Sequence, residues 1–130
     1  MMKDSSENIL LIDHNDFGIL RLTLNDLDNK NALSESLMQK LIIAITKASK
    51  DKSVKVIVIA STGSVFCSGH NLKEINEARK ADDGGKSYYL ELFNTCSSLM
   101  QLIVNCTKPV IAEVNGIATA AGCQLVASCD

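Results

Sequence analysis

The sequence predicts an α/β fold, in which helices pack on a sheet through right-handed crossover connections. Apolar runs of strand length alternate with segments whose apolar residues recur every three or four positions. The chain has 130 residues, 46% of them hydrophobic and 22% charged, which suits one globular domain with a buried core. We therefore expect residues 1–130 to belong to a single domain.

A β-hairpin is expected first. Ile9–Ile12 and Phe17–Leu24 are short apolar or alternating runs with turn-forming residues between them. In the second run Leu20, Leu22 and Leu24 recur with period two, which predicts that they face the core. The polar stretch that follows the hairpin, residues 25–31, is predicted to be a loop.

Helices and strands are expected to alternate after this loop. Ser34 can cap a helix whose apolar positions run from Leu37 to Ala48 at helical spacing. Val54–Ala60 is a largely β-branched run, typical of a strand buried on both faces. The remaining elements are a short helix over Asn71–Lys80, a long helix over Ser87–Val104, a strand over Val110–Val114 and a last helix through Gln124–Ser128.

Two glycine-containing loops are the candidate functional segments. Ser61–Gly69 and Asn115–Gly122 each follow an expected strand and precede an expected helix. Ligands of α/β sheets bind at such places, where free backbone N–H groups can hold an anion or a developing oxyanion. No P-loop, GxGxxG or GxSxG motif occurs, so nucleotide binding and the usual hydrolase elbow are not indicated. The alternative is that these glycines only make tight turns.

Composition excludes several other classes. The formal charge of −2 argues against binding to nucleic acid or anionic membrane, and no apolar run approaches the ~20 residues of a membrane span. Five cysteines without a CxxC pair, and no histidine at zinc-ligand spacing, predict no metal site and a reducing compartment. Met1–Glu7 lacks the apolar region of a secretory signal, so we expect a cytoplasmic location, or a mitochondrial one if a leader was removed.

Three motifs carry a family resemblance. Phe66–Glu74 (FCSGHNLKE) and Pro109–Leu125 (PVIAEVNGIATAAGCQL) resemble the two signatures of the crotonase, or enoyl-CoA hydratase/isomerase, superfamily. Asn29–Ser34 (NKNALS) resembles the loop that meets coenzyme A in this family. The resemblance implies a crotonase-like spiral of ββα repeats, acyl-CoA thioester substrates, no tightly bound cofactor, and a homotrimer or hexamer.

The resemblance also implies a site. In this family two backbone N–H groups hold the thioester oxygen of the substrate and stabilise the enolate that forms. The resemblance places these two groups at His70 and Ala121. Coenzyme A contacts are expected along Asn29–Ser34 and Phe66–Glu74, at Lys30, Ala32, Ser68, Gly69 and Lys73, with the lysines as partners of phosphates. The His70 imidazole is either an acid or base or, as we prefer, a pocket-lining side chain.

One position departs from the family pattern. Gln124 stands where typical hydratases have a glutamate, and a neutral amide cannot accept a proton from water at useful rates. We therefore expect feeble hydratase activity, and alternatives remain open: isomerase or hydrolase chemistry, or a non-catalytic assembly or regulatory subunit. Glu74 is interpreted as a solvated acid in the first turn of its helix and Glu113 as an acid facing solvent or a subunit contact, neither of them catalytic. Because Cys129-Asp130 follows a helix without a stop signal, we expect an N-terminal portion of a longer domain, inactive by itself.

Overall fold

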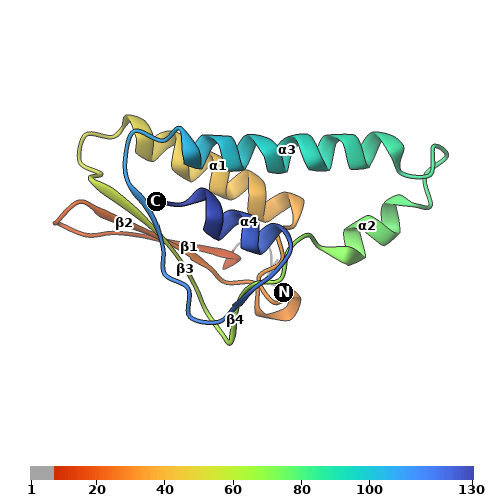
Figure 1. Cartoon of the computed structure of the whole chain (residues 1–130), viewed down its shortest axis with the longest axis horizontal. Helices are drawn as coiled ribbons and strands as arrows, with labels where there is room; N and C mark the ends of the chain where they lie inside the picture. Colours follow the sequence, from red (N-terminus) through yellow and green to blue (C-terminus); the bar gives the residue numbers. More distant parts are fainter. Residues whose placement is uncertain (1–7) are drawn as a thin grey trace, which may run out of the picture.

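A four-stranded sheet forms one side of the protein (Figure 1). β1 (Leu10–His14) is antiparallel to β2 (Ile19–Leu24), and β3 (Val56–Ser61) and β5 (Val110–Ala112) continue the sheet in parallel, in the order β1-β2-β3-β5. The computed structural model describes residues 8–130, so the expectation for Met1–Glu7 lies outside the described residues. The predicted hairpin and both predicted strands are confirmed, with ends moved by one to two residues.

Helices α1 (Glu35–Lys50), α3 (Lys86–Val104) and α4 (Ala121–Ser128) lie on the same side of this sheet (Figure 1). The short helix α2 (Leu72–Ala78) connects the sheet region to α3. The Ser34 hydroxyl accepts a hydrogen bond from Leu37 N at 3.2 Å, as predicted for the cap of α1. The four predicted helices are therefore confirmed, and α4 begins three residues earlier than expected.

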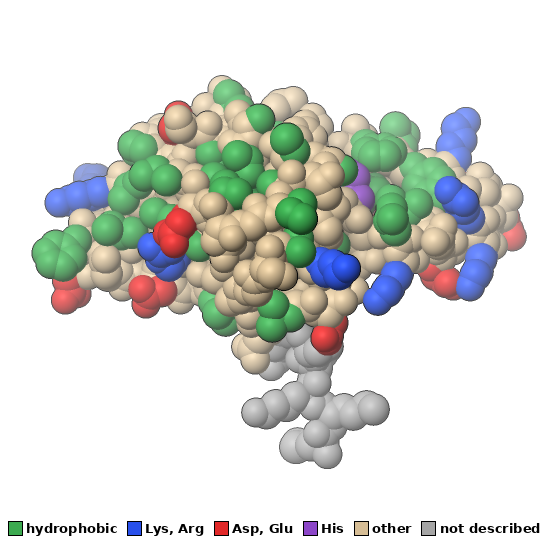
Figure 2. Space-filling view, turned by 60° about the horizontal axis from the view of Figure 1, so that its bottom comes forward, with side chains coloured by type: hydrophobic (Ala, Val, Ile, Leu, Met, Phe, Trp, Pro, Cys, Tyr) green, Lys and Arg blue, Asp and Glu red, His purple; other side chains and the backbone are tan. Residues whose placement is uncertain are grey.

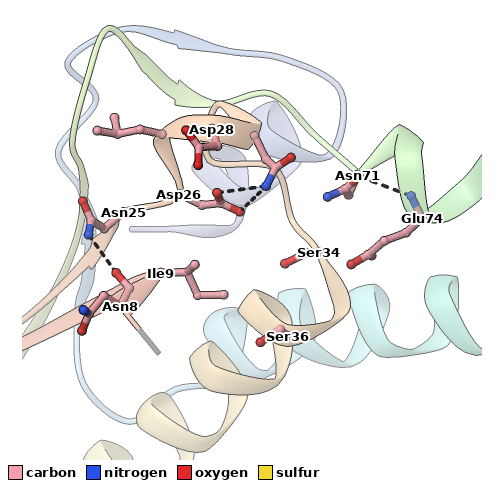
Figure 3. A pocket seen from close by; sticks show the side chains of 11 residues that line it. Asn8, Ile9, Asn25, Asp26, Asp28, Ser34, Ser36, Asn71 and Glu74 are labelled. Carbon is pink, nitrogen blue, oxygen red and sulfur yellow. Dashed lines mark hydrogen bonds between the residues drawn. The ribbon is translucent and has the colours of Figure 1, made fainter. Parts of the chain in front are cut away.

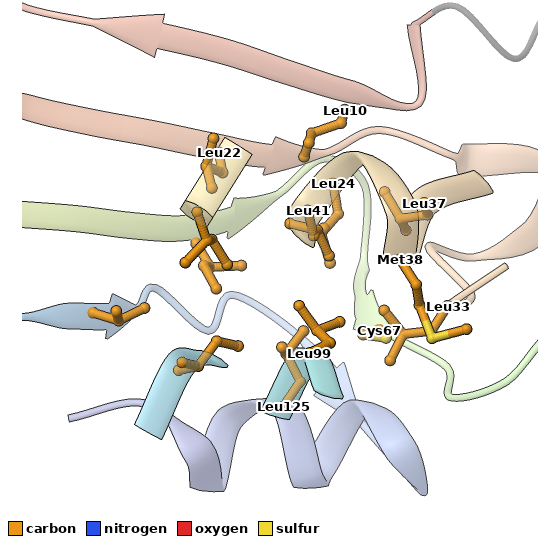
Figure 4. Packing of buried hydrophobic residues seen from close by; sticks show 14 of the residues in the cluster. Leu10, Leu22, Leu24, Leu33, Leu37, Met38, Leu41, Cys67, Leu99 and Leu125 are labelled. Carbon is orange, nitrogen blue, oxygen red and sulfur yellow. The ribbon is translucent and has the colours of Figure 1, made fainter. Parts of the chain in front are cut away.

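The core lies between the sheet and these three helices (Figure 4). Leu22 and Leu24 of β2 are fully buried against Leu41 of α1, Leu99 of α3 and Leu125 of α4 in one cluster. Burying each such side chain contributes about 1.5–3 kcal/mol. The period-two and helical patterns read from the sequence thus mark the residues that form this core.

A second, two-stranded sheet corrects the sequence-based prediction of two loops. β4 (Val65–Cys67) and β6 (Ile117–Ala118) pair in parallel, inside the segments that were predicted to be loops. The polar loop before α1 likewise contains a 3-10 turn, Leu27–Asn29. Strands of two or three residues are too short to show a hydrophobic period, and their pairing joins segments about fifty residues apart, so the pattern could not reveal them.

Candidate functional site

The small sheet brings the two predicted functional segments together. Val65 of β4 is paired with Ile117 of β6, and Cys67 with Ala118. Just beyond the strands, Thr119 N donates a hydrogen bond to Cys67 O at 3.1 Å. The residues that follow each strand therefore start from fixed and neighbouring positions.

Gly69 lets these two segments approach closely. Its φ is +95°, and a Cβ built there would lie 2.9 Å from Ala120 Cβ and 3.4 Å from Ala121 N. A side chain at this position would collide with the opposite segment, and an L-residue rarely adopts this φ. Glycine thus places the backbone that leads into His70 directly beside the N–H of Ala121.

Two backbone N–H groups remain unused at this junction. Within residues 8–130, neither His70 N nor Ala121 N donates a hydrogen bond. Ala121 is the first residue of α4, and the first N–H groups of a helix have no intrahelical acceptor and lie at the positive end of its dipole. The structure thus brings the two predicted donors into one place.

The residue before α4 has a strained backbone. Ala120 has φ 52° and ψ −125°, a region that non-glycine residues seldom occupy, yet its carbonyl accepts a hydrogen bond from Gln124 N at 3.1 Å. Gly122, two residues later, packs so closely on β4 that an added Cβ would overlap the carbonyl of Cys67. Backbone strain of this kind concentrates at functional sites.

A groove beside this junction gathers most of the predicted coenzyme A residues. Lys30, Ala32, Ser68, His70 and Lys73 all line one groove with a volume of about 240 Å³. Its other lining residues are Asp28, Asn29, Asn71 and Leu72. Gly69 is not part of the lining, although it stands between Ser68 and His70, and its carbonyl accepts a hydrogen bond from Leu33 N at 2.7 Å. Ala121 and Gln124 lie outside the groove lining, and Gln124 is exposed on α4.

Asn31 fixes the loop that carries Lys30 and Ala32 of this groove, and the sequence analysis did not name it as a site residue. Lys30 and Asn31 both have left-handed backbone conformations, with φ of 52° and 54°. The Asn31 amide is 1% exposed; it donates to Thr62 O at 3.0 Å and Val65 O at 2.9 Å, and its oxygen accepts from Asp26 N at 2.8 Å. Asparagine tolerates this conformation better than most residues, so the Asn-Lys-Asn run was the available signal.

Lys73 is held at the edge of the groove. Its ammonium donates a hydrogen bond to Asn29 Oδ1 at 3.2 Å, and the Asn29 amide nitrogen in turn donates to both carboxylate oxygens of Asp26 at 3.0 Å. Ser68 closes the same edge, because its N and Oγ donate to the carbonyls of Lys30 and Asn29. The positive charge of Lys73 is therefore positioned over the groove.

The His70 imidazole is fixed by its surroundings. Its ring meets the ring of Phe93 edge-on, with centroids 5.5 Å apart and an interplanar angle of 79°. Burial lowers the pKa of His70 below its usual value of 6.5. Nδ1 is enclosed and has no hydrogen-bond partner among residues 8–130. Burial therefore favours the neutral form of the ring.

An apolar surface adjoins the groove at His70. Leu72 of α2 and Leu90 and Phe93 of α3 are exposed by 70%, 66% and 56%. Figure 2 shows hydrophobic side chains gathered at the end of the molecule where α2 and α3 lie. Since Phe93 contacts His70, this apolar surface reaches the groove.

The two acids considered as alternatives have structural partners. Glu74 is half-buried, and its Oε2 accepts hydrogen bonds from Glu35 N at 3.1 Å and Tyr88 Oη at 3.4 Å, which corrects its interpretation as a solvated acid. Burial and the neighbouring Glu74 raise the pKa of Tyr88 to about 12. Glu113 is exposed and forms an ion pair with Arg21 at 2.6 Å.

A second, larger polar pocket lies against the 25–31 loop (Figure 3). It has a volume of about 480 Å³, and its lining includes Ile9, Asn25, Asp26, Ser34 and Glu74. Asp26 of this pocket is linked to the groove through Asn29: the Asn29 amide nitrogen donates to the Asp26 carboxylate, and Asn29 Oδ1 accepts a hydrogen bond from Lys73 Nζ. None of the predicted site residues lines this pocket.

The fold and this junction define a class of protein: an α/β chain in which unused backbone N–H groups of two segments meet beside a groove. The sequence profile of the family described as "Enoyl-CoA hydratase/isomerase" matches residues 14–130. The chain therefore belongs to the enoyl-CoA hydratase/isomerase family, and its fold is the crotonase fold. The resemblance carried by the sequence motifs is confirmed.

Particular relatives are similar over nearly the whole chain. "Enoyl-CoA hydratase domain-containing protein 3, mitochondrial" of Xenopus laevis is 51% identical over 113 residues, which cover 87% of this chain and 37% of the relative. An enoyl-CoA hydratase structure from Mycobacterium smegmatis superposes with a TM-score of 0.86 at 45% identity, covering 95% of this chain and 46% of that one. The structure of human enoyl-CoA hydratase domain-containing protein 3 gives 0.84 at 43% identity, covering 94% and 46%. The chain thus spans less than half the length of these relatives.

Two further findings concern the environment of the protein. No helix within residues 8–130 has the length and apolar character required to cross a membrane. All five cysteines are free, and two of them, Cys67 and Cys96, are buried in the core.

Proposed function

We propose that this chain binds acyl-CoA thioesters and stabilises the enolate formed from them with an oxyanion hole. The backbone N–H groups of His70 and Ala121 are the two donors. The observation that carries the proposal is the close approach of Gly69 to Ala121, with both N–H groups unused. Family membership supports the substrate class.

Such a site acts on the charge that develops during the reaction. Removing an α proton from a thioester moves negative charge onto the carbonyl oxygen. Fixed N–H donors stabilise that charge without reorganising, and one such donor is worth about 3–4 kcal/mol in a comparable site. The dipole of α4 adds to the effect at Ala121, because the positive end of the helix faces the oxygen.

Coenzyme A is proposed to occupy the groove. Lys30 and Lys73 supply the positive charge that suits its phosphates, and Ala32 and Ser68 supply small and polar wall positions. Gly69, between Ser68 and His70, remains a proposed contact through its backbone. The apolar surface of Leu72, Leu90 and Phe93 suits the acyl group, because it adjoins the groove at His70. We propose that coenzyme A enters only as part of the substrate and that the protein holds no tightly bound cofactor.

Hydration of a double bond is proposed to be weak. Gln124 is exposed on α4 and offers only an amide, so it can orient a water molecule but cannot take its proton. One missing acid or base costs about 10²–10⁴-fold in rate. We therefore favour a thioester reaction whose acid or base lies elsewhere, such as an isomerisation or a hydrolysis.

The second candidate is a non-catalytic subunit that assembles with or regulates an active relative. The neutral, exposed Gln124 favours it, because the site then lacks a carboxylate at that position. Exchange of subunits with an active family member, without turnover by this chain itself, supports this candidate. Turnover of any acyl-CoA by the purified chain excludes it.

Assembly and location are separate proposals. We propose a homotrimer or hexamer, supported by apolar side chains that are exposed near β5 and β6, with Ile111 at 48% and Ile117 at 66%. Sedimentation tests this assembly. The free cysteines suit a reducing compartment, either the cytoplasm or, as the name of the Xenopus relative states for that protein, the mitochondrion. Fractionation of the source cells distinguishes the two.

Calorimetry with acetyl-CoA and crotonyl-CoA on the full chain tests the main proposal. Ala121→Pro removes one N–H at the first position of α4, where helices accept proline, whereas Ala121→Ser keeps it. We expect both ligands to bind the wild type, and Ala121→Pro to weaken acetyl-CoA binding relative to Ala121→Ser, with circular dichroism confirming folded variants. Binding of neither ligand by the wild type contradicts the proposal.

A further inference from the structure

The His70 side chain lies where three parts of the site meet. Its backbone forms a bridge with Leu33, its ring packs edge-on against Phe93 of α3, and its side chain lines the groove together with Lys30 and Lys73. The ring is therefore held in one orientation. The role proposed for the backbone N–H of His70 does not account for the imidazole ring, which is fixed beside the groove.

The two ring nitrogens differ in their surroundings. Nδ1 is enclosed without a partner, while Nε2 makes no hydrogen bond to residues 8–130 and is not enclosed. A buried N–H without an acceptor costs about 1–3 kcal/mol, so we assign the proton of the neutral ring to Nε2. His70, which lines the groove, consequently carries a preoriented N–H donor on its less enclosed ring nitrogen.

We propose that this Nε2–H is a binding group for the acyl-CoA ligand and donates a hydrogen bond to one of its carbonyl oxygens. The inference rests on the proposed function and adds to it a side-chain contact separate from the backbone donor of the same residue. A neutral donor suits a neutral acceptor, such as an amide or thioester carbonyl. The ammonium groups of Lys30 and Lys73 are the matching partners for phosphate.

The charges in the groove support the assignment of a carbonyl to His70 and of phosphates to the lysines. Its charged side chains are Asp28, Lys30 and Lys73, and the Lys73 ammonium is already held by Asn29 at the edge. His70 stands where the groove adjoins the apolar ring of Phe93. A carbonyl oxygen that binds beside this ring would lose hydrogen bonds to water, and the Nε2–H replaces one of them.

The decisive variant is His70→Phe, because it keeps an aromatic ring against Phe93 and keeps the backbone N–H while it removes the Nε2 donor. His14→Phe, at an exposed histidine of β1, is the matched control. Calorimetry on the full chain uses coenzyme A alone, which has only amide carbonyls, and acetyl-CoA, which adds the thioester carbonyl. We expect His70→Phe to weaken binding about 3- to 10-fold and His14→Phe to leave it unchanged.

Comparison of the coenzyme A and acetyl-CoA titrations identifies the carbonyl that accepts the hydrogen bond. A loss with both ligands assigns the acceptor to an amide carbonyl, and a loss with acetyl-CoA alone assigns it to the thioester. Unchanged affinity of His70→Phe for both ligands, while the wild type binds them, overturns this inference and leaves the proposed function intact. Binding of neither ligand by the wild type overturns both.

Nitrogen NMR of the His70 ring gives a readout that packing alone does not move. At pH 7 we expect a neutral ring with its proton on Nε2, and a shift of the Nε2 signal when acetyl-CoA saturates the protein. The His14 ring provides the internal reference. A proton on Nδ1, a charged ring at pH 7, or an Nε2 signal that acetyl-CoA does not move contradicts the inference.

Discussion

The core under α1 and α3 and the junction of β4 with β6 are built in opposite ways. In the core, large side chains such as Leu22, Leu41 and Leu99 fill the space between regular elements. At the junction, small residues allow backbone to touch backbone, and the proposed oxyanion donors are main-chain N–H groups. The comparison teaches that in this protein side chains supply stability, whereas the positions of main-chain atoms supply the candidate site.

The largest expected effect breaks the core. Leu99 on α3 is fully buried, so Leu99→Ala should lower the free energy of unfolding by about 2–5 kcal/mol through lost burial and a residual cavity. Leu90→Ala makes the same change at a side chain of α3 that is 66% exposed and should cost far less. Urea denaturation measures both, and equal losses would contradict this account of the core.

The next effect breaks the junction by adding one methyl group. In Gly122→Ala the new Cβ meets the Cys67 carbonyl, so α4 must move away from β4. We expect a loss of about 1–3 kcal/mol in stability together with weaker acetyl-CoA binding. Cys123→Ala, at the exposed next residue of α4, is the control and should change neither quantity. A stable Gly122→Ala variant with normal binding would show that the close approach is not needed.

A smaller effect, this time a gain in stability, is expected from relief of the backbone strain at Ala120. Ala120 has φ 52° and ψ −125°, which glycine adopts without strain, so Ala120→Gly should stabilise the fold by about 1 kcal/mol. The same substitution at Ala127, exposed within α4, should instead cost about 1 kcal/mol of helix stability. Thermal unfolding compares the two, and destabilisation by both would refute strain at Ala120.

The smallest effect is a pH dependence at His70. Burial lowers its folded-state pKa below 6.5, so the unfolded chain takes up this proton at a higher pH than the folded chain does. Its contribution to stability is therefore present above pH 6.5 and is lost as the pH falls below that value. Denaturation at pH 7.5 and pH 5.5 should show a larger loss for the wild type than for His70→Phe. A difference between the two proteins that is independent of pH would rule out this titration.

The sequence was sufficient for the core because its signals are local and repeated. The alternation of Leu20, Leu22 and Leu24 and the stripe of Leu92, Cys96 and Leu99 each follow the period of one element. Glycine and small residues before a helix also pointed to the two candidate loops, and the assignment of His70 and Ala121 as donors within them came from the family resemblance of the motifs. Such local patterns can be recognised without knowing which residues pack against them.

The rest of the site depends on contacts between distant segments. β4 and β6 are too short for a period, and only their pairing brings Gly69 to Ala121. The buried amide of Asn31 likewise donates to carbonyls at least 31 positions away. The contact of His70 with Phe93 joins residues 23 positions apart. A local pattern carries no information about such partners, so the structure had to supply them.

Infrared spectroscopy of bound acetyl-CoA labelled with ¹³C at its thioester carbonyl tests the central claim most directly, because hydrogen bonds from two fixed N–H groups weaken the C=O bond. We predict that its stretching frequency falls below the value in water on binding to the full chain. His70→Phe, which keeps both main-chain donors, should retain most of the fall, whereas Ala121→Pro should lose part of it. A bound carbonyl with the same frequency as in water would contradict an oxyanion hole at His70 and Ala121.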